Sequence, residues 1–166
     1  MNSTRRARLR ALAKLNLDLR VLYPRADGYH ELRTIFQTIS LADTIDVALT
    51  PARRTRIDID GNVDIPDNLI VKAATLALAA MRTAAHVEFR LRKHIPMGAG
   101  LGGGSSDAAA VLLGLPVLAG KRLELARLLE LASALGSDVP FFLLGGMAAG
   151  IGRGTELFPL PDARPR

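Results

Sequence analysis

The stretch Ile95-Pro96-Met97-Gly98-Ala99-Gly100-Leu101-Gly102-Gly103-Gly104-Ser105-Ser106-Asp107 organises the rest of this chain. Five of the seven residues from 98 to 104 are glycine, which permits positive φ angles and lets a ligand approach the backbone closely. Residues 87–92 before it alternate between apolar and polar, as in a half-buried strand. The alanine-rich segment after it predicts a helix, capped by Ser105, Ser106 or Asp107. This order aims free N–H groups and a positive helix end at one point, which suits phosphate.

Two common phosphate-binding patterns do not fit this loop. No Gly-Lys-Ser/Thr closes it, as a P-loop would require. Its glycines do not stand in a first βα turn, where the dinucleotide-binding G-x-G-x-x-G lies, and about twenty residues on, where dinucleotide-binding proteins carry an acidic residue, stand Lys121 and Arg122. A flexible linker of small residues is the plain alternative, but linkers are rarely followed at once by a cap and an alanine-rich helix.

The composition indicates one globular domain without cysteine chemistry. The 166 residues suffice for one core and are few for two domains, and 49% of them are apolar. The chain contains no cysteine, which excludes a disulfide framework and a cysteine-based metal site and fits a reducing cytoplasm. No apolar run approaches the ~18 residues that a membrane span needs. We therefore expect a cytoplasmic protein with no membrane partner.

The chain is basic, with a formal net charge of +6 and four arginines among its first ten residues. The other basic residues are scattered, and 4% aromatic residues are too few for a base-stacking platform, so we expect no nucleic-acid partner. We interpret residues 1–12 as a basic leader and part of the remaining charge as attraction for a phosphorylated substrate. An ordinary solvated surface explains the charge equally well.

A second informative segment covers residues 13–21, where apolar and polar residues alternate. This period predicts a strand with one apolar and one polar face. Lys14 and Asn16 lie on the polar face, so we expect their side chains to project the same way, close together. A solvated lysine on a strand is the plain alternative for Lys14.

Further elements follow from the same periodicities. Strands are predicted over 34–39, 44–49 and 56–60, and two short strands within 147–158. One helix opens at Asp67 or Asn68 and runs to about Met81, and another covers 121–135 and ends at Gly136. We expect Pro116 to end the helix after the glycine loop early.

Four stretches together resemble the GHMP small-molecule kinases. They are the loop at 96–109, which is similar to the phosphate loop of that family, Ala13-Lys14-Leu15-Asn16-Leu17, Arg25-Ala26-Asp27-Gly28-Tyr29-His30 and Gly136-Ser137-Asp138-Val139-Pro140-Phe141-Phe142. The stretch at 25–30 resembles only the branch that acts on a cytidine diphosphate-linked methylerythritol. The resemblance implies an α+β fold, the GHMP kinase N-terminal domain (a ribosomal-protein-like left-handed βαβ fold), with a mixed sheet and helices packed on it.

The resemblance also implies roles for individual residues. Asp138 would accept the proton of the substrate hydroxyl, and Lys14 would keep Asp138 ionised and steady the developing charge. Asn16 would orient the substrate, while Tyr29 and His30 would hold its cytosine. ATP would contact Asn68 near the adenine and the loop residues Pro96, Met97, Gly98, Ala99, Gly100, Leu101, Gly102, Gly103, Gly104, Ser105 and Ser106. Mg²⁺ would arrive with ATP rather than in a protein metal site, with Ser105 or Ser106 the nearest hydroxyl.

The implied partner is a small molecule, the methylerythritol derivative, phosphorylated on its 2-hydroxyl in non-mevalonate isoprenoid (terpenoid) synthesis; a homodimer is left open. The resemblance covers about residues 13–161, so we assign 13–166 to the ATP-binding domain and expect the family's C-terminal domain to be absent. Three alternatives follow: an inactive truncated nucleotide-binding domain, another GHMP kinase such as mevalonate or homoserine kinase, and a basic nucleic-acid-binding module of the same fold. A steep salt dependence of RNA binding would favour the last.

Overall fold

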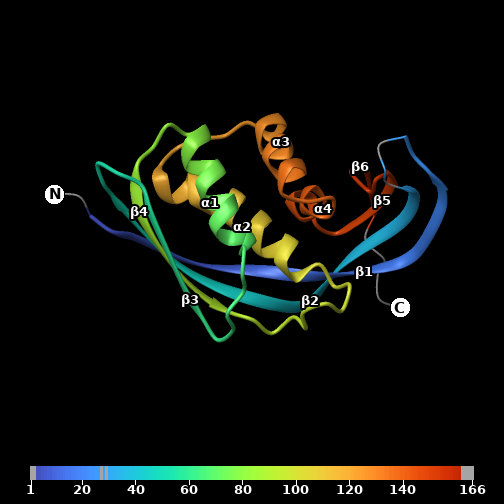
Figure 1. The fold of residues 1–166 in the computed structure, drawn as a ribbon, viewed down its shortest axis with the longest axis horizontal. Coiled ribbons are helices and arrows are strands. Elements are labelled where there is room, and N and C mark those ends of the chain that lie inside the picture. Colours follow the sequence, from blue (N-terminus) through green and yellow to red (C-terminus); the bar gives the residue numbers. More distant parts are fainter. Residues whose placement is uncertain (1–2, 27, 29, 162–166) are drawn as a thin grey trace.

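The computed structural model describes residues 3–26, 28 and 30–161. Within these ranges the chain forms a sheet with helices on one face (Figure 1). The elements in chain order are β1 (Arg5–Pro24), β2 (His30–Pro51), β3 (Arg56–Gly61), α1 (Leu69–Ala80), β4 (Ala85–Arg92), α2 (Gly103–Ala119), α3 (Leu125–Leu135), α4 (Val139–Leu144), β5 (Met147–Gly152) and β6 (Glu156–Leu160).

The strands form one mixed sheet in the order β3-β4-β2-β5-β6, and β1 pairs with β2. β1 and β2 make a long antiparallel ribbon that extends from the pair Arg5↔Leu49 to the pair Pro24↔His30. β3 and β4 are parallel and joined through α1, which makes a βαβ unit, while the other pairs are antiparallel. The predicted α+β architecture, a mixed sheet covered by helices, is therefore confirmed.

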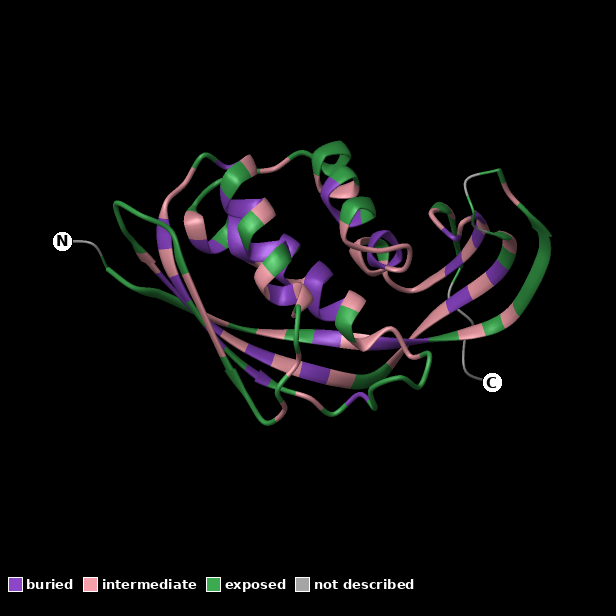
Figure 2. Ribbon diagram, in the orientation of Figure 1, coloured by how far each residue is buried: buried purple, intermediate pink, exposed green. Residues whose placement is uncertain are grey.

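The core lies between the helices and the sheet, where Figure 2 shows the buried residues gathered. The alternation predicted for 87–92 is confirmed, because every second residue of β4 is buried against the helices. The core residues of the central strands and of the two long helices include Ile45, Val47, Leu49, Val87, Phe89, Leu91, Ala73, Ala77, Val111 and Leu112. This layer fixes the end of β4 and the start of α2, which are the two ends of the glycine loop.

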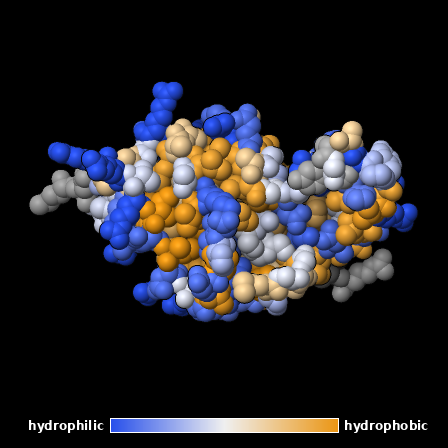
Figure 3. Space-filling model, viewed as in Figure 1, coloured by the Kyte–Doolittle hydropathy of each residue, from blue (hydrophilic) through white to orange (hydrophobic). Residues whose placement is uncertain are grey.

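One prediction about the first strand was wrong, and the orientation of its two faces was not predicted. β1 begins at Arg5, so residues 5–12, which we expected as a basic leader, belong to the sheet. The apolar face of 13–21 also points outward, since Leu15, Leu17, Leu19 and Val21 are exposed while Lys14 is buried. The register between β1 and β2 shifts between Leu12 and Lys14, which changes the residues that face the helices beyond that point. Figure 3 shows hydrophobic residues on the surface at the end of the molecule where β1 turns into β2, at the right of the view.

The ends of α2 also differ from prediction. The helix begins at Gly103 after Gly102, which has a φ of 71° and, among the described residues, no side chain caps it. The predicted capping role of Ser105, Ser106 or Asp107 is therefore wrong. Pro116 does not end the helix, which continues to Ala119, because a proline in the last turn removes only one backbone hydrogen bond.

The other helix predictions hold with smaller changes. α1 ends where expected, and α3 ends at Gly136 but begins at Leu125, because residues 121–124 are not helical. The short helix α4 was not predicted. Among the described residues, we find no helix with the length and apolarity that crossing a membrane requires.

Candidate functional site

The glycine loop between β4 and α2 presents open backbone. Gly98, Gly100 and Gly102 have φ angles of 72°, 73° and 71°, which residues with a side chain rarely adopt. A Cβ at Gly98 or Gly100 would meet no atom of the described chain within 4 Å. The first helical hydrogen bond of α2 runs from the Ser106 N–H to the Gly102 carbonyl at 2.9 Å, so the N–H groups before it lack partners within the helix. These groups can bind an anion.

The loop is fixed directly to β1 and α4. The Lys14 N–H donates to the Leu101 carbonyl at 3.0 Å. A Cβ at Gly102 would stand 2.7 Å from Cζ of Phe142 and 3.2 Å from Cγ of Lys14. Position 102 therefore needs a glycine, both for the positive φ angle and because a side chain there would collide with Phe142. The aliphatic part of the Lys14 side chain packs against the loop at this position.

The Lys14 side chain carries a buried positive charge beside the loop. It is 7% exposed, and its ammonium donates to Asn16 Oδ1 at 2.6 Å. The nearest carboxylate is that of Asp138, with Nζ and Oδ2 3.4 Å apart. The ammonium also lies 5.2 Å from the ring centroid of Phe36. The carboxylate and the amide oxygen together compensate for the desolvation of the charge.

Asp138 is free to face this ammonium because it does not cap α4. It occupies the N-cap position, but among the described residues its side chain makes no capping hydrogen bond. The carboxylate is 35% exposed, so one side faces Lys14 and another is open to solvent. A group in this position can accept a proton from a ligand hydroxyl.

Asn16 is held by a short hydrogen-bond chain. Its amide donates to Thr34 Oγ1 at 2.7 Å, and the Thr34 hydroxyl donates to the Asp18 carbonyl at 2.8 Å. Thr34 is 1% exposed. The chain keeps the Asn16 amide oxygen toward Lys14, and it confirms that Lys14 and Asn16 project the same way from β1.

We expect Thr34→Val to destabilise the fold by about 1–3 kcal/mol, because it leaves a buried donor on Asn16 and the Asp18 carbonyl without their partner. Urea unfolding measures the loss. The control is Thr75→Val on α1, where the hydroxyl bonds the Val71 carbonyl at an exposed position, and it should change stability by less than about 0.5 kcal/mol. Equal losses of stability in both variants would show that the hydrogen bonds of Thr34 to Asn16 and Asp18 contribute no more than an exposed one.

His30 lies at the start of β2 and faces the same hollow as Asp138. This hollow has a volume of about 320 Å³ and is lined by Val21, His30, Leu32, Ser137, Asp138 and Arg153. The structure thus brings together His30 and Asp138, which are 108 positions apart in the chain. Tyr29, predicted beside His30, lies outside the described residues.

Asn68 caps α1, as predicted, because its Oδ1 accepts a hydrogen bond from the Ile70 N–H at 3.0 Å. Next to it, Leu69 lies 3.8 Å from the position of a Cβ on Gly104, so the start of α1 lies near the start of α2. Asn68 also lines a hollow of about 180 Å³ beside β3 and the end of β4. The residue after Asn68 therefore reaches the first turn of α2.

The two loop serines differ in accessibility. Ser105 is partly exposed, whereas Ser106 is 3% exposed. A hydroxyl on Ser105 can therefore be reached from solvent more easily than one on Ser106. Among the described residues, no group of histidines and carboxylates could hold a metal ion.

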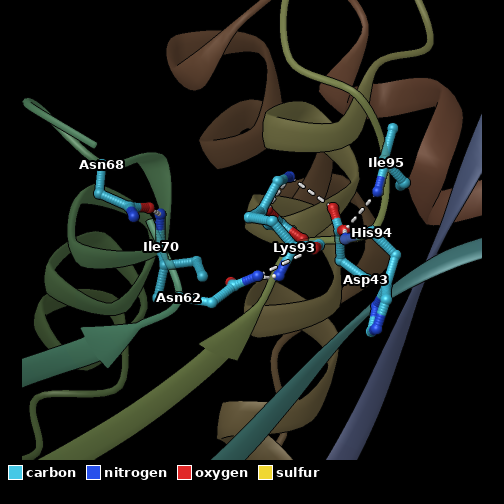
Figure 4. A network of polar contacts seen from close by, with 8 residues as sticks. Asp43, Asn62, Asn68, Ile70, Lys93, His94 and Ile95 are labelled. Atoms are coloured by element: carbon cyan, nitrogen blue, oxygen red, sulfur yellow. Dashed lines mark hydrogen bonds and ion pairs between the residues drawn. The ribbon is translucent and has the colours of Figure 1, made fainter. Parts of the chain in front are cut away.

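A buried ionic cluster behind the loop was missed by sequence reasoning. Lys93 contacts both Asp43 and Asp107, and Figure 4 shows the contacts of this network. Asp43 lies within a long strand, Lys93 directly follows a strand whose alternate residues are exposed, and Asp107 fitted a helix cap. Nothing in the local pattern indicated that the three side chains meet.

A hollow larger than those beside His30 and Asn68 lies elsewhere in the described part of the chain. Its volume is about 750 Å³, and its lining includes charged residues of β1, β2, β3 and β4 such as Arg8, Asp46 and Arg90. Arg8 and Asp46 form an ion pair there at 2.6 Å. The hollow contains none of Lys14, Asp138 and the glycine loop, so we do not assign the function to it.

Residues 68–146 match the family model "GHMP kinases N terminal domain". The chain is 67% identical over 162 residues to 4-diphosphocytidyl-2-C-methyl-D-erythritol kinase of Solibacter usitatus, a match that covers 98% of this chain and 51% of that protein. The enzyme of the same name from Pelotomaculum thermopropionicum is 46% identical, over 91% of this chain and 54% of that protein. The chain thus spans about half the length of the curated relatives it matches.

The solved structures agree with these matches. A crystal structure of 4-(cytidine 5'-diphospho)-2C-methyl-D-erythritol kinase superposes with a TM-score of 0.79 at 45% identity, over 93% of this chain and 55% of that one. Homoserine kinase from Cytophaga hutchinsonii has a TM-score of 0.64 at 18% identity and shares the fold. The similarity covers β1, the glycine loop and α4, which hold the candidate site.

Proposed function

Because residues 68–146 match the N-terminal domain of the GHMP kinases and the chain is 67% identical to a relative named as such a kinase, we propose that it transfers the γ-phosphoryl group of ATP to the 2-hydroxyl of 4-diphosphocytidyl-2-C-methyl-D-erythritol. This is the reaction of non-mevalonate isoprenoid synthesis that the names of its relatives suggest. The observation that carries the proposal is the 3.4 Å contact between Lys14 and Asp138 beside the open glycine loop.

The glycine loop would bind the phosphates of ATP. Its exposed backbone and the free N–H groups at the start of α2 suit phosphate oxygens, and the positive φ angles keep the loop concave. Residues 96–106 would line this cradle. Asn68 would lie toward the adenine, since it borders a hollow and its neighbour Leu69 reaches the first turn of α2.

Asp138 and Lys14 would carry out the proton transfer. The Asp138 carboxylate would take the proton of the 2-hydroxyl as that oxygen bonds to the γ-phosphorus and the bond from this phosphorus to the β,γ-bridging oxygen breaks, releasing ADP. The Lys14 ammonium, 3.4 Å away, would stabilise the negative charge that develops. Asn16 would orient the substrate from its fixed position beside Lys14.

The residues present fit a magnesium ion that is carried by the nucleotide. Mg²⁺ retains waters and binds substrate phosphates with few protein ligands, which agrees with a site that offers a serine hydroxyl rather than a carboxylate cage. When bound, the ion would neutralise phosphate charge. Ser105, as the more accessible hydroxyl, would be its protein contact.

The cytidine end of the substrate would lie in the hollow that His30 and Asp138 share. His30 offers a ring edge for hydrogen bonds to a base, and the apolar side chains of Val21 and Leu32 form part of the lining. The substrate would then extend from the cytosine at His30 to the reacting hydroxyl at Asp138.

A panel of phosphoryl acceptors tests the proposed function. ADP release would be measured with Mg-ATP and 4-diphosphocytidyl-2-C-methyl-D-erythritol, mevalonate or homoserine as acceptor. We expect release with the first only, and we expect His30→Ala to raise KM for this acceptor by about tenfold or more while KM for ATP stays unchanged. Release with mevalonate or homoserine would assign the chain to another branch of the family.

A further inference from the structure

We propose that Asp43, Lys93 and Asp107, here called the loop clamp, hold the two ends of the glycine loop in the conformation that binds nucleotide phosphates. The three residues come from β2, from the residue after β4 and from the first turns of α2. They are positioning residues behind the loop. The inference rests on the proposed nucleotide site and adds a determinant of its shape.

The clamp fixes the entry of the loop through Asp43. Asp43 Oδ1 accepts hydrogen bonds from the N–H groups of His94 at 2.6 Å and Ile95 at 2.9 Å, the two residues that lead into the loop (Figure 4). The Asn62 side chain holds the preceding residue, because it accepts from the Lys93 N–H at 2.8 Å and donates to the Lys93 carbonyl at 3.1 Å. These hydrogen bonds fix the path of the backbone from the end of β4 into the glycine loop.

The clamp fixes the exit of the loop through Lys93. Its ammonium donates to Asp43 Oδ2 and, at 2.9 Å, to Asp107 Oδ2 on α2. It also lies 3.0 Å from the position that a Cβ on Gly103 would occupy. One ammonium thus connects the strand that enters the loop to the helix that leaves it, directly beneath the first residue of α2.

The charges of the clamp do not balance. Its side chains are at most 6% exposed and bring two carboxyl groups to one ammonium. Asp43 has three donors, whereas Asp107 Oδ1 has no hydrogen-bond partner among the described residues. A buried ionic cluster contributes little to stability compared with an apolar one of the same size. Its presence here agrees with a role in positioning the loop.

The clamp is withdrawn from solvent on the α2 side as well. Burial raises the pKa of Asp107 to about 7, against the opposing effect of the Lys93 ammonium, and Asp43 raises it further. The contact between Lys93 and Asp107 therefore lies inside the protein, where it can hold α2 against the end of β4.

Amide hydrogen exchange in the ligand-free chain tests the positioning role. We expect Lys93→Met to speed exchange of the amides in 97–104 by roughly tenfold relative to the unsubstituted chain. The control is Val87→Ala, which truncates a fully buried side chain on β4 and should destabilise the whole fold without selectively speeding the loop. Where Lys93→Met fails to fold, Asp43→Asn is measured instead, with the same expectation. Equal loop exchange in the clamp variant and the control would overturn the proposal.

Binding of Mg-ADP separates a failure of the clamp from a failure of the proposed nucleotide site. We expect Lys93→Met to raise the dissociation constant of Mg-ADP by about tenfold relative to Val87→Ala, because the loop is no longer held in its binding conformation. Equal dissociation constants in these two variants would overturn the proposal. Absence of nucleotide binding in the unsubstituted chain would overturn the proposed function, while the exchange measurement would still decide whether the clamp positions the loop.

Discussion

Asp138→Asn should lower kcat for phosphoryl transfer by about 10²–10⁴-fold and leave the dissociation constant of Mg-ATP within about twofold. Asparagine has the shape of aspartate but cannot accept the hydroxyl proton. The substitution removes no capping bond, since the Asp138 side chain makes none among the described residues. It also leaves Lys14 with its hydrogen bond to Asn16 and its contact with Phe36.

Single-turnover kinetics measure the rate of phosphoryl transfer, and calorimetric titration measures the dissociation constant of Mg-ATP. Asp46→Asn is the matched control, because it makes the same chemical change at a carboxylate that pairs with Arg8 far from the loop. The control should retain full turnover. Turnover of Asp138→Asn within tenfold of the unsubstituted chain would exclude Asp138 as the base, and an equal loss of ATP binding would indicate a structural role.

Gly102→Ala should weaken nucleotide binding, with at least a tenfold rise in the dissociation constant of Mg-ATP, and should also lower kcat. A Cβ at this position would stand 2.7 Å from Phe142 Cζ and 3.2 Å from Lys14 Cγ, and the φ angle of 71° is strained for any residue with a side chain. Either the loop or the stem of Lys14 must move. The loss of kcat follows because the same contact holds the Lys14 stem in place.

Gly98→Ala separates these two causes. Gly98 has nearly the same φ angle, 72°, but a Cβ there meets no described atom within 4 Å. Both variants therefore bear the backbone strain, and only Gly102→Ala displaces Phe142 and Lys14. In chemical unfolding we expect Gly102→Ala to be less stable than Gly98→Ala by about 1–3 kcal/mol. Equal stability, with equal kcat, would show that the φ angle alone requires glycine at 102.

The candidate site residues could be proposed from the sequence because they lie in short stretches that resemble the GHMP kinases. The glycine loop, the alternation that places Lys14 beside Asn16, and the Gly-Ser-Asp turn at 136–138 are all local patterns. The structure adds that Lys14 and Asp138 lie 3.4 Å apart and that His30 faces the hollow beside Asp138. The roles of these residues stay predictions.

The features that could not be predicted depend on contacts between residues far apart in the sequence. The register shift after Leu12 depends on pairing with β2, so the period of 13–21 could not show that its leucines face solvent. Likewise, the strand pairing of residues 5–12 with the far half of β2 overrides their basic, leader-like composition. Asp107 resembles a helix cap in sequence, and only the position of Lys93 after β4 makes it part of a buried cluster.

Transfer of label from γ-³²P-ATP to 4-diphosphocytidyl-2-C-methyl-D-erythritol in a single turnover tests the central claim most directly. We predict that label appears on the acceptor with the unsubstituted chain and Asp46→Asn, and that transfer falls by about 10²–10⁴-fold with Asp138→Asn while ATP stays bound. Label that appears only as inorganic phosphate, or transfer that persists without the Asp138 carboxylate, would contradict a phosphoryl-transfer site built from Lys14, Asp138 and the glycine loop.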